Sequence, residues 1–206
     1  MGSRIMHLVT ADLVCRQLTI SEASHFYLGA VVPDAQTPKD LTHFFDYNPQ
    51  GLTIAVNYNR FIEKYQPNNH TPFELGYLCH LITDDFWLKD FFLAWIKEKV
   101  EENPGFQEAY HRDFRRLNSM LLRWNKNESL QAVLKTGTYN GGIEELDVSK
   151  VQPFLEDMQN DFITPVDTES RPLEVFEFED IIQYIHNSVE KTIQVIKRIS
   201  GEGRES

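Results

Sequence analysis

Apolar residues recur at helical spacing along most of this chain. Between residues 52 and 65 they fall at i, i+3 and i+4, which is typical of an amphipathic helix. The longest apolar run begins after Thr71 and Pro72, a residue pair that favours a helix start. Residues 29–41 and 135–142 are rich in proline, glycine or short polar residues, and they are predicted to be loops. The ranges predicted to be helical are 4–18, 21–30, 52–65, 71–101, 105–125, 151–162 and 178–199.

This pattern predicts an all-α fold, a single-domain helical bundle. A chain of 206 residues is long enough to bury a substantial core. Its two cysteines, Cys15 and Cys79, both fall inside apolar helical patterns, which favours buried free thiols over a disulfide. No segment has the roughly 18 consecutive apolar residues that a membrane-spanning helix needs.

The predicted central helix carries a histidine and a carboxylate in strongly apolar surroundings. His80 and Asp84 stand four residues apart and therefore share one face of this helix. Burying an unpaired charge costs several kcal/mol, unless the group is paired or binds a metal. A structural hydrogen bond between the two side chains would satisfy both. Alternatively, the pair offers one nitrogen and one oxygen ligand to a divalent metal ion.

Three more residues of the metal-ligand type lie in apolar segments upstream. His7 follows Ile5 and Met6, Asp34 follows a run of apolar residues that ends in proline, and His43 lies among aromatic neighbours. Each has an ordinary explanation, a core histidine or a turn residue. Together with the central pair they make three imidazoles and two carboxylates. This set is large enough for one closed or two partly open metal sites.

The order of these residues resembles the zinc-dependent phospholipase C family. The resemblance rests on an early histidine (His7), a Gly-x-x-x-Pro-Asp stretch (29–34), a following histidine (His43), and Gly-Tyr-x-x-His-x-x-x-Asp (76–84). It extends over roughly residues 4–118. The resemblance implies an all-helical, phospholipase C/P1 nuclease-like fold that holds a cluster of metal ions.

The resemblance also implies a ligand set. Asp34, His43, His80 and Asp84 match the residues that hold one metal, and Asp84 bridges to a second metal held by His7. The expected metal is zinc, with two or three ions, although iron, manganese or nickel also suit mixed imidazole and carboxylate ligands. Asp34 is the expected general base.

This sequence matches the ligands of the family's third metal less well. Asp90 stands six residues beyond the bridging aspartate, and His111 fits a histidine position on a later helix. Arg115 stands where the family has a glutamate, and Glu108 or Asp113 remain as substitutes. The resemblance therefore predicts Asp90 and His111 as ligands of a third, altered site.

Charge and composition narrow the expected partners. With 31 Asp and Glu against 20 Lys and Arg, the net charge of −11 disfavours nucleic acid and stable association with an anionic membrane. The first seven residues, Met1 to His7, contain no apolar signal region. We therefore expect a cytoplasmic protein that acts on a small soluble phosphoester. The oligomeric state is left open.

The predicted function is metal-dependent hydrolysis of phosphoric esters by a metal-activated water, with residues 1–125 as a metal-binding core and residues 126–206 as a helical cover. One alternative is a non-catalytic, metal-stabilised helical module that binds a protein partner through its acidic C-terminal third. Another is a phosphohydrolase of the His-Asp type. That class usually shows adjacent His and Asp, and here no histidine is followed directly by aspartate.

Overall fold

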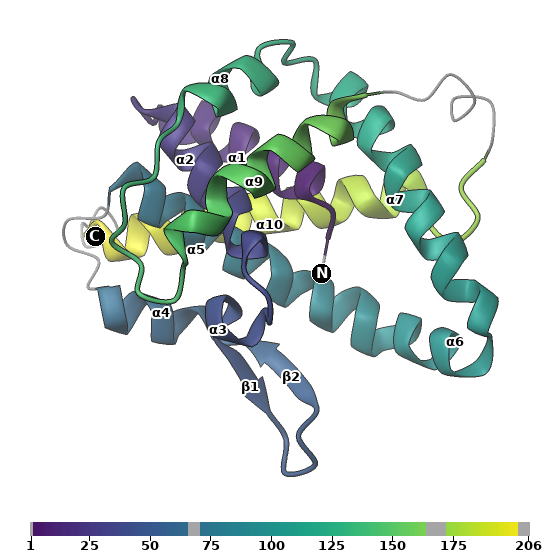
Figure 1. The fold of residues 1–206 in the computed structure, drawn as a ribbon. Helices are drawn as coiled ribbons and strands as arrows, with labels where there is room; N and C mark the ends of the chain where they lie inside the picture. The colour runs from purple at the N-terminus through teal and green to yellow at the C-terminus, as the bar shows by residue number, and fades with distance from the viewer. Residues whose placement is uncertain (1, 66–70, 164–171, 202–206) are drawn as a thin grey trace.

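Helices dominate the computed structural model of this protein, which describes residues 2–65, 71–163 and 172–201 (Figure 1). The only sheet within these residues is a two-stranded hairpin, so the all-α prediction is confirmed. The elements are α1 (Arg4–Leu18), α2 (Ala23–Val31), η1 (Val32–Ala35), α3 (Asp40–His43), β1 (Phe45–Tyr47), β2 (Thr53–Val56), α4 (Tyr58–Tyr65), α5 (Pro72–Phe86), η3 (Trp87–Ile96), α6 (Lys97–Glu102), α7 (Pro104–Asn125), α8 (Leu130–Thr136), α9 (Val148–Met158), η4 (Gln159–Phe162) and α10 (Phe178–Ile199).

The core forms where α1, α2, α5 and α10 pack against one another. Helix α10 contacts both α1 and α5, and Figure 1 shows it running behind them. Its apolar stripe, which includes Ile181, Ile185 and Val189, is buried. This stripe repeats at helical spacing, so burying it is what holds the last helix on the bundle. Helix α10 lies in the C-terminal segment, residues 126–206, and is part of the core. The division of the chain at residue 125 stays a prediction.

Local sequence signals set the starts of the two helices that matter most for the site. Ser3 caps α1, because its hydroxyl accepts a hydrogen bond from the backbone N–H of Met6 at 3.2 Å. Thr71 and Glu74 form a capping box at the start of α5, followed by Pro72 in the first turn. Each cap satisfies N–H groups that have no partner inside the helix. Both helices begin where the sequence predicts.

The long central helix changes its winding after the site. Beyond Phe86 the chain continues as a π-helix, η3, before α6 completes the rod. Trp87 is fully buried here and stacks on Phe91, with ring centroids 4.7 Å apart. Long π-helical segments are rare, and short ones occur often at functional sites. The wider turn alters which residues after Asp84 face the cluster.

The helix predicted for residues 52–65 is wrong in its first part. Residues Thr53–Val56 form strand β2, which pairs antiparallel with β1 in a hairpin that projects from the bundle (Figure 1). Gly51 turns the chain with a φ of +78°, and β-branched Thr53, Ile54 and Val56 suit an extended strand. Periodicity over so few residues does not separate the two structures. Helix α4 then begins at Tyr58.

Residues 29–41, predicted as a loop, also differ from expectation. The structure places the end of α2, η1 and the start of α3 in this stretch. Short helices of this kind escape detection from sequence because four residues complete barely one turn. None of the described helices is long and apolar enough to cross a membrane.

Two glycines allow α2 and α5 to cross in direct backbone contact. A Cβ atom built on Gly29 would lie 2.0 Å from the carbonyl oxygen of Phe73, and one on Gly76 would lie 2.0 Å from that of Phe26. No other residue type fits at such a crossing. The close approach brings the backbone of Ala30 against His80, and so it positions the site directly.

Candidate metal centre

The structure gathers the five predicted ligands from four elements. His7 comes from α1, Asp34 from η1, His43 from the end of α3, and His80 and Asp84 from successive turns of α5. The side chains of the three histidines and Asp84 are fully buried, and that of Asp34 retains 8% exposure. Residues far apart in sequence thus meet in one buried polar cluster inside an apolar bundle.

Three of these side chains, His43, His80 and Asp84, lie at the mutual spacing of ligands around one metal ion, and Asp34 lies beside His43. Nε2 of His43 lies 3.1 Å from Oδ2 of Asp84, 3.4 Å from Oδ1 of Asp34 and 3.2 Å from Nε2 of His80. Nε2 of His80 lies 3.4 Å from the same Asp84 oxygen. Ligands bound at about 2.0–2.1 Å to a tetrahedral zinc are separated by about 3.3 Å. The geometry therefore fits a zinc site held by His43, His80 and Asp84, with Asp34 next to it.

The hydrogen bonds around the cluster leave lone pairs pointing inward. Nδ1 of His80 lies 2.8 Å from the carbonyl oxygen of Ala30, and Nδ1 of His43 lies 3.0 Å from that of Lys39. A carbonyl oxygen only accepts, so each Nδ1 carries the hydrogen and donates. Each Nε2 then presents a lone pair to the cluster. Outer hydrogen bonds of this kind orient metal-binding histidines in general.

One proton bound within the cluster would leave several of its buried nitrogen and oxygen atoms without a hydrogen-bond partner. A proton on Nε2 of His43 could be shared with Asp84, and the pKa of His43 is raised because hydrogen bonds to Asp34 and Asp84 outweigh the opposing effect of burial. Both nitrogens of His7 would still have no hydrogen-bond partner within the described part of the chain, and neither would Oδ1 of Asp84. Buried polar atoms without a partner are costly and call for an explanation. A divalent cation satisfies several of these acceptors at once.

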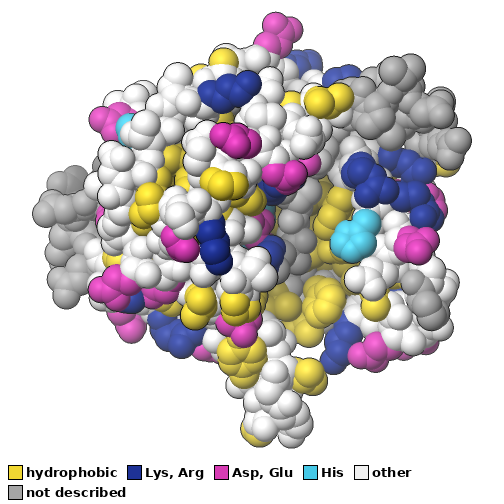
Figure 2. All heavy atoms as spheres, viewed as in Figure 1, with side chains coloured by type: hydrophobic (Ala, Val, Ile, Leu, Met, Phe, Trp, Pro, Cys, Tyr) yellow, Lys and Arg dark blue, Asp and Glu magenta, His cyan; other side chains and the backbone are white. Residues whose placement is uncertain are grey.

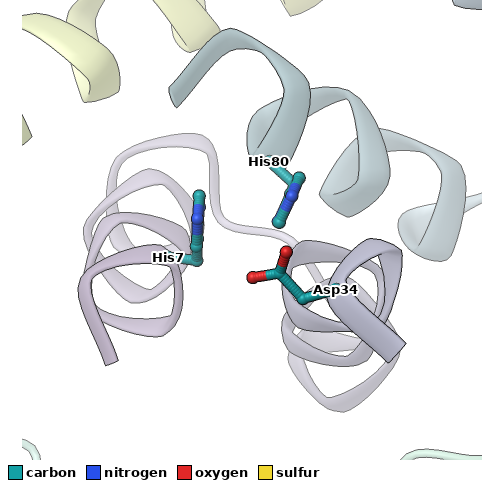
Figure 3. A group of neighbouring side chains, drawn as sticks. All are labelled: His7, Asp34 and His80. Carbon is teal, nitrogen blue, oxygen red and sulfur yellow. The ribbon is translucent and has the colours of Figure 1, made fainter. Parts of the chain in front are cut away.

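His7 faces the other oxygen of the shared carboxylate. Its Nε2 lies 3.3 Å from Oδ1 of Asp84, and its ring stacks on His80 with centroids 4.0 Å apart. Figure 3 shows the Asp34 carboxylate directed between His7 and His80, and the ligand atoms of these three residues lie within 4.8 Å of one another. One oxygen of Asp84 thus faces His7, and the other faces His43 and His80. This placement suits a bridging carboxylate between two metal sites.

The pKa shifts of His80, Asp84 and Asp34 favour the protonation states that bind metals, whereas the raised pKa of His43 means that this imidazole must lose a proton to bind one. Burial and the neighbouring His7 lower the pKa of His80 to about 4, so this imidazole is neutral at pH 7. Burial alone would raise the pKa of Asp84, but the nearby His7 and His80 hold it well below its usual range. Asp34 behaves in the same way, through a hydrogen bond to His43 and the charges of His80 and Lys39. Neutral histidine and ionised carboxylate are the ligand forms.

Asp34 connects the buried cluster to the surface. It lines a cleft of about 470 Å³, here called the Asp34 cleft, whose walls come from the start of α1, from α7, and from α9 and η4. Lys39 forms an ion pair with Asp34 at this edge. Lys39 was not predicted, because no sequence motif marks it. The lining residues are Gly2, Ser3, Arg4, Asp34, Lys39, His111, Phe114, Arg115, Asn118, Phe154 and Asp161.

The structure does not bring the predicted third-site residues into the cluster. Asp90 is exposed on η3, and His111 is exposed on α7, where it lines the cleft. Neither belongs to a group of three possible ligands among the residues described. Glu108, one proposed substitute, is exposed and lies 3.8 Å from Arg112. A third site built on Asp90 and His111 therefore has no support in this arrangement.

Asp113, the other substitute, has a structural role. It is fully buried, and its carboxylate accepts hydrogen bonds from the backbone N–H groups of Glu174, Val175 and Phe176 at 2.7–3.3 Å. Arg116 donates to it as well, at 3.1 Å. These bonds use the oxygens that a metal would need. Asp113 therefore anchors the segment that leads into α10.

Replacing Asp113 by alanine should destabilise the fold by about 3 kcal/mol, because several buried N–H groups and the Arg116 guanidinium lose their partner. Urea unfolding at a fixed zinc concentration measures the change. The bound metal content should stay at the wild-type value. Glu108→Ala on the same helix is the matched control and should change stability by less than about 0.5 kcal/mol. Loss of metal from the Asp113 variant without loss of stability would contradict the anchoring role.

Comparison with known proteins agrees with this centre. Residues 3–96 match the family described as zinc-dependent phospholipase C. The matched range contains all five clustered ligands and ends before His111. No curated protein and no solved structure matches the chain. This matched part of the chain, just under half of its length, carries the complete buried cluster and is similar to the zinc-dependent phospholipase C family.

Proposed function

We propose that this protein is a zinc-dependent hydrolase of phosphoric esters with a phospholipase C-like reaction. The observation that carries the proposal is a buried set of inward-facing acceptor atoms whose one partly exposed member among the five clustered residues, Asp34, lines a cleft. A purely structural metal site would be closed on all sides, whereas a catalytic site keeps an open position. Here the open side is a cleft large enough for a small substrate.

All five clustered residues would be zinc ligands, and one of them, Asp34, would also act as the general base. Asp34, His43, His80 and Asp84 would hold one zinc ion, and His7 with the second oxygen of Asp84 would contribute to another. Bound zinc supplies positive charge that stabilises a phosphoryl group and lowers the pKa of water. Asp34 is the ligand on the cleft side, so its carboxylate is placed to orient a water molecule and take its proton. Lys39 steers that carboxylate through its ion pair.

The proposed substrate is a small soluble phosphoester, handled by two zinc ions without a third. The acidic net charge of −11 opposes both nucleic acid and an anionic membrane surface. A cytoplasmic location is part of this proposal. Iron, manganese or nickel remain compatible with the ligand types, and elemental analysis distinguishes them.

Asp34→Asn should lower turnover by a factor of about 10² to 10⁴, the usual contribution of a general base. The amide keeps an oxygen for the site but no longer takes a proton. The assay uses bis-p-nitrophenyl phosphate, p-nitrophenyl phosphate and a phosphocholine ester at saturating zinc, with bound metal measured in parallel. Asp90→Asn, an exposed change of the same kind, is the control and should leave turnover unaltered.

Two outcomes would count against the proposal. Wild-type turnover of the Asp34→Asn variant with full metal content would remove Asp34 as the base. A fully metallated wild-type protein that hydrolyses none of the three esters would favour the alternative of a metal-stabilised binding module.

A further inference from the structure

The Asp34 cleft is locally basic in an acidic protein. Its lining includes the cations Arg4, Lys39 and Arg115, against the carboxylates Asp34 and Asp161. Figure 2 shows Lys and Arg side chains and a histidine at the edge of a hollow on this face. The Asp34 carboxylate is already paired with Lys39 and contacts His43 of the buried cluster. Arg4 is paired as well, with Asp157 and Asp161, so the cation of this lining that keeps no carboxylate partner among the described residues is Arg115. A concave surface with such a free positive charge attracts anions.

Two of the basic side chains in this cleft have no carboxylate partner within the described residues. His111 and Arg115 stand four residues apart on α7, share a face, and are both exposed. Arg112 and Arg116 on the same helix differ, because Glu174 binds both at 2.7–2.8 Å. An arginine and a histidine that line the cleft are thus left available to an anionic ligand.

The start of α1 adds to the positive potential of the cleft. Gly2, Ser3 and Arg4 line it, and the first turn of this 15-residue helix contains no acidic residue. The N-terminus of a helix carries a partial positive charge and favours nearby anions. The Ser3 hydroxyl donates to Oδ1 of Asn118 at 2.8 Å, which ties this terminus to α7. The two walls of the cleft are therefore held in a defined relative position.

Building on the proposed hydrolase, we propose that its substrates carry a second anionic group beside the phosphoryl group, and that Arg115 and His111 bind it. The scissile phosphoryl group lies at Asp34 and the zinc cluster. A carboxylate or second phosphate on the alcohol part then reaches the unpaired face of α7. Arginine binds such groups through two parallel hydrogen bonds. A quaternary ammonium group, as in phosphocholine, meets like charge at the same place.

Product-like monoesters test this preference without turnover. Glycerol 3-phosphate and 3-phosphoglycerate share a three-carbon skeleton and differ in one carboxylate, and phosphocholine carries a cation instead. Calorimetric titration of the zinc-loaded wild-type protein should give about tenfold tighter binding of 3-phosphoglycerate than of glycerol 3-phosphate, and the weakest binding for phosphocholine. Arg115→Gln should bring the first two affinities close together. Arg112→Gln, which removes the same charge outside the cleft, should keep the wild-type ratio.

The outcomes separate this inference from the proposed reaction. Equal affinity for the three monoesters would overturn the inference, and so would an Arg115→Gln variant with the wild-type ratio. A uniform loss of affinity for all three in that variant would also overturn it, because Arg115 would then bind the common phosphate. A preserved preference in a protein that hydrolyses no ester would uphold the anionic second group and refute the hydrolase proposal alone.

Discussion

Gly76→Ala should destabilise this protein by about 3 kcal/mol or more, at the upper end of the usual cost of overpacking. The added Cβ would lie 2.0 Å from the carbonyl oxygen of Phe26, a backbone atom that cannot rotate away. The two helices would have to separate. His80 would then lose its hydrogen bond to Ala30, so weaker zinc binding should accompany the loss of stability.

Urea unfolding with and without excess zinc measures both effects. Gly105→Ala is the matched control, since its Cβ would approach only the side chain of Asn103, at 3.3 Å, near an exposed helix start. Alanine is the better helix former by about 1 kcal/mol, so the control should be neutral or stabilising. A Gly76→Ala variant as stable as the wild type would show that the crossing of α2 and α5 tolerates a wider spacing.

His80→Ala should abolish metal binding, because this residue lies in both groups of possible ligands. Protein purified without a metal-affinity column should contain at least about one equivalent of zinc, as the ligand count requires. A ligand present at about 1,000 times its dissociation constant stabilises a folded protein by about 4 kcal/mol. A chelator should therefore lower the melting temperature of the wild type and leave that of the variant unchanged.

Two exposed residues supply the controls for this experiment. Asp90→Ala and His111→Ala should each retain the wild-type metal content, since neither lies in the cluster. Loss of metal in either would restore a third site. A His80→Ala variant with unchanged stability, made from a wild type that holds no metal, would reduce the cluster to an ordinary buried hydrogen-bond network.

Some features of the site could be predicted from the sequence because they depend on local geometry. The four-residue spacing of His80 and Asp84 places both on one face of any α-helix that contains them. The capping residues Ser3 and Thr71 mark the starts of α1 and α5 for the same reason. The order of His7, Asp34 and His43 indicated the family, and the structure brings all three to the central pair.

Other predictions depended on a local pattern that has two solutions, or on a regular winding that the structure does not keep. The apolar positions at the start of residues 52–65 suit a strand as well as a helix, and the pairing of β1 with β2 selects the strand. Asp90 was assigned by counting from Asp84, but η3 begins between them at Trp87. A π-helix rotates less per residue than an α-helix, so the count no longer gives the direction of the side chain.

The sequence by itself thus determined the helical class and the chemical types of the buried ligands. The tertiary structure alone decided that Gly29 and Gly76 meet, that the carbonyl of Ala30 orients His80, and that Arg115 faces the same cleft as Asp34. These relations join elements far apart along the chain. They depend on how closely and at what angle helices pack, and the side chains of the whole core set that packing together.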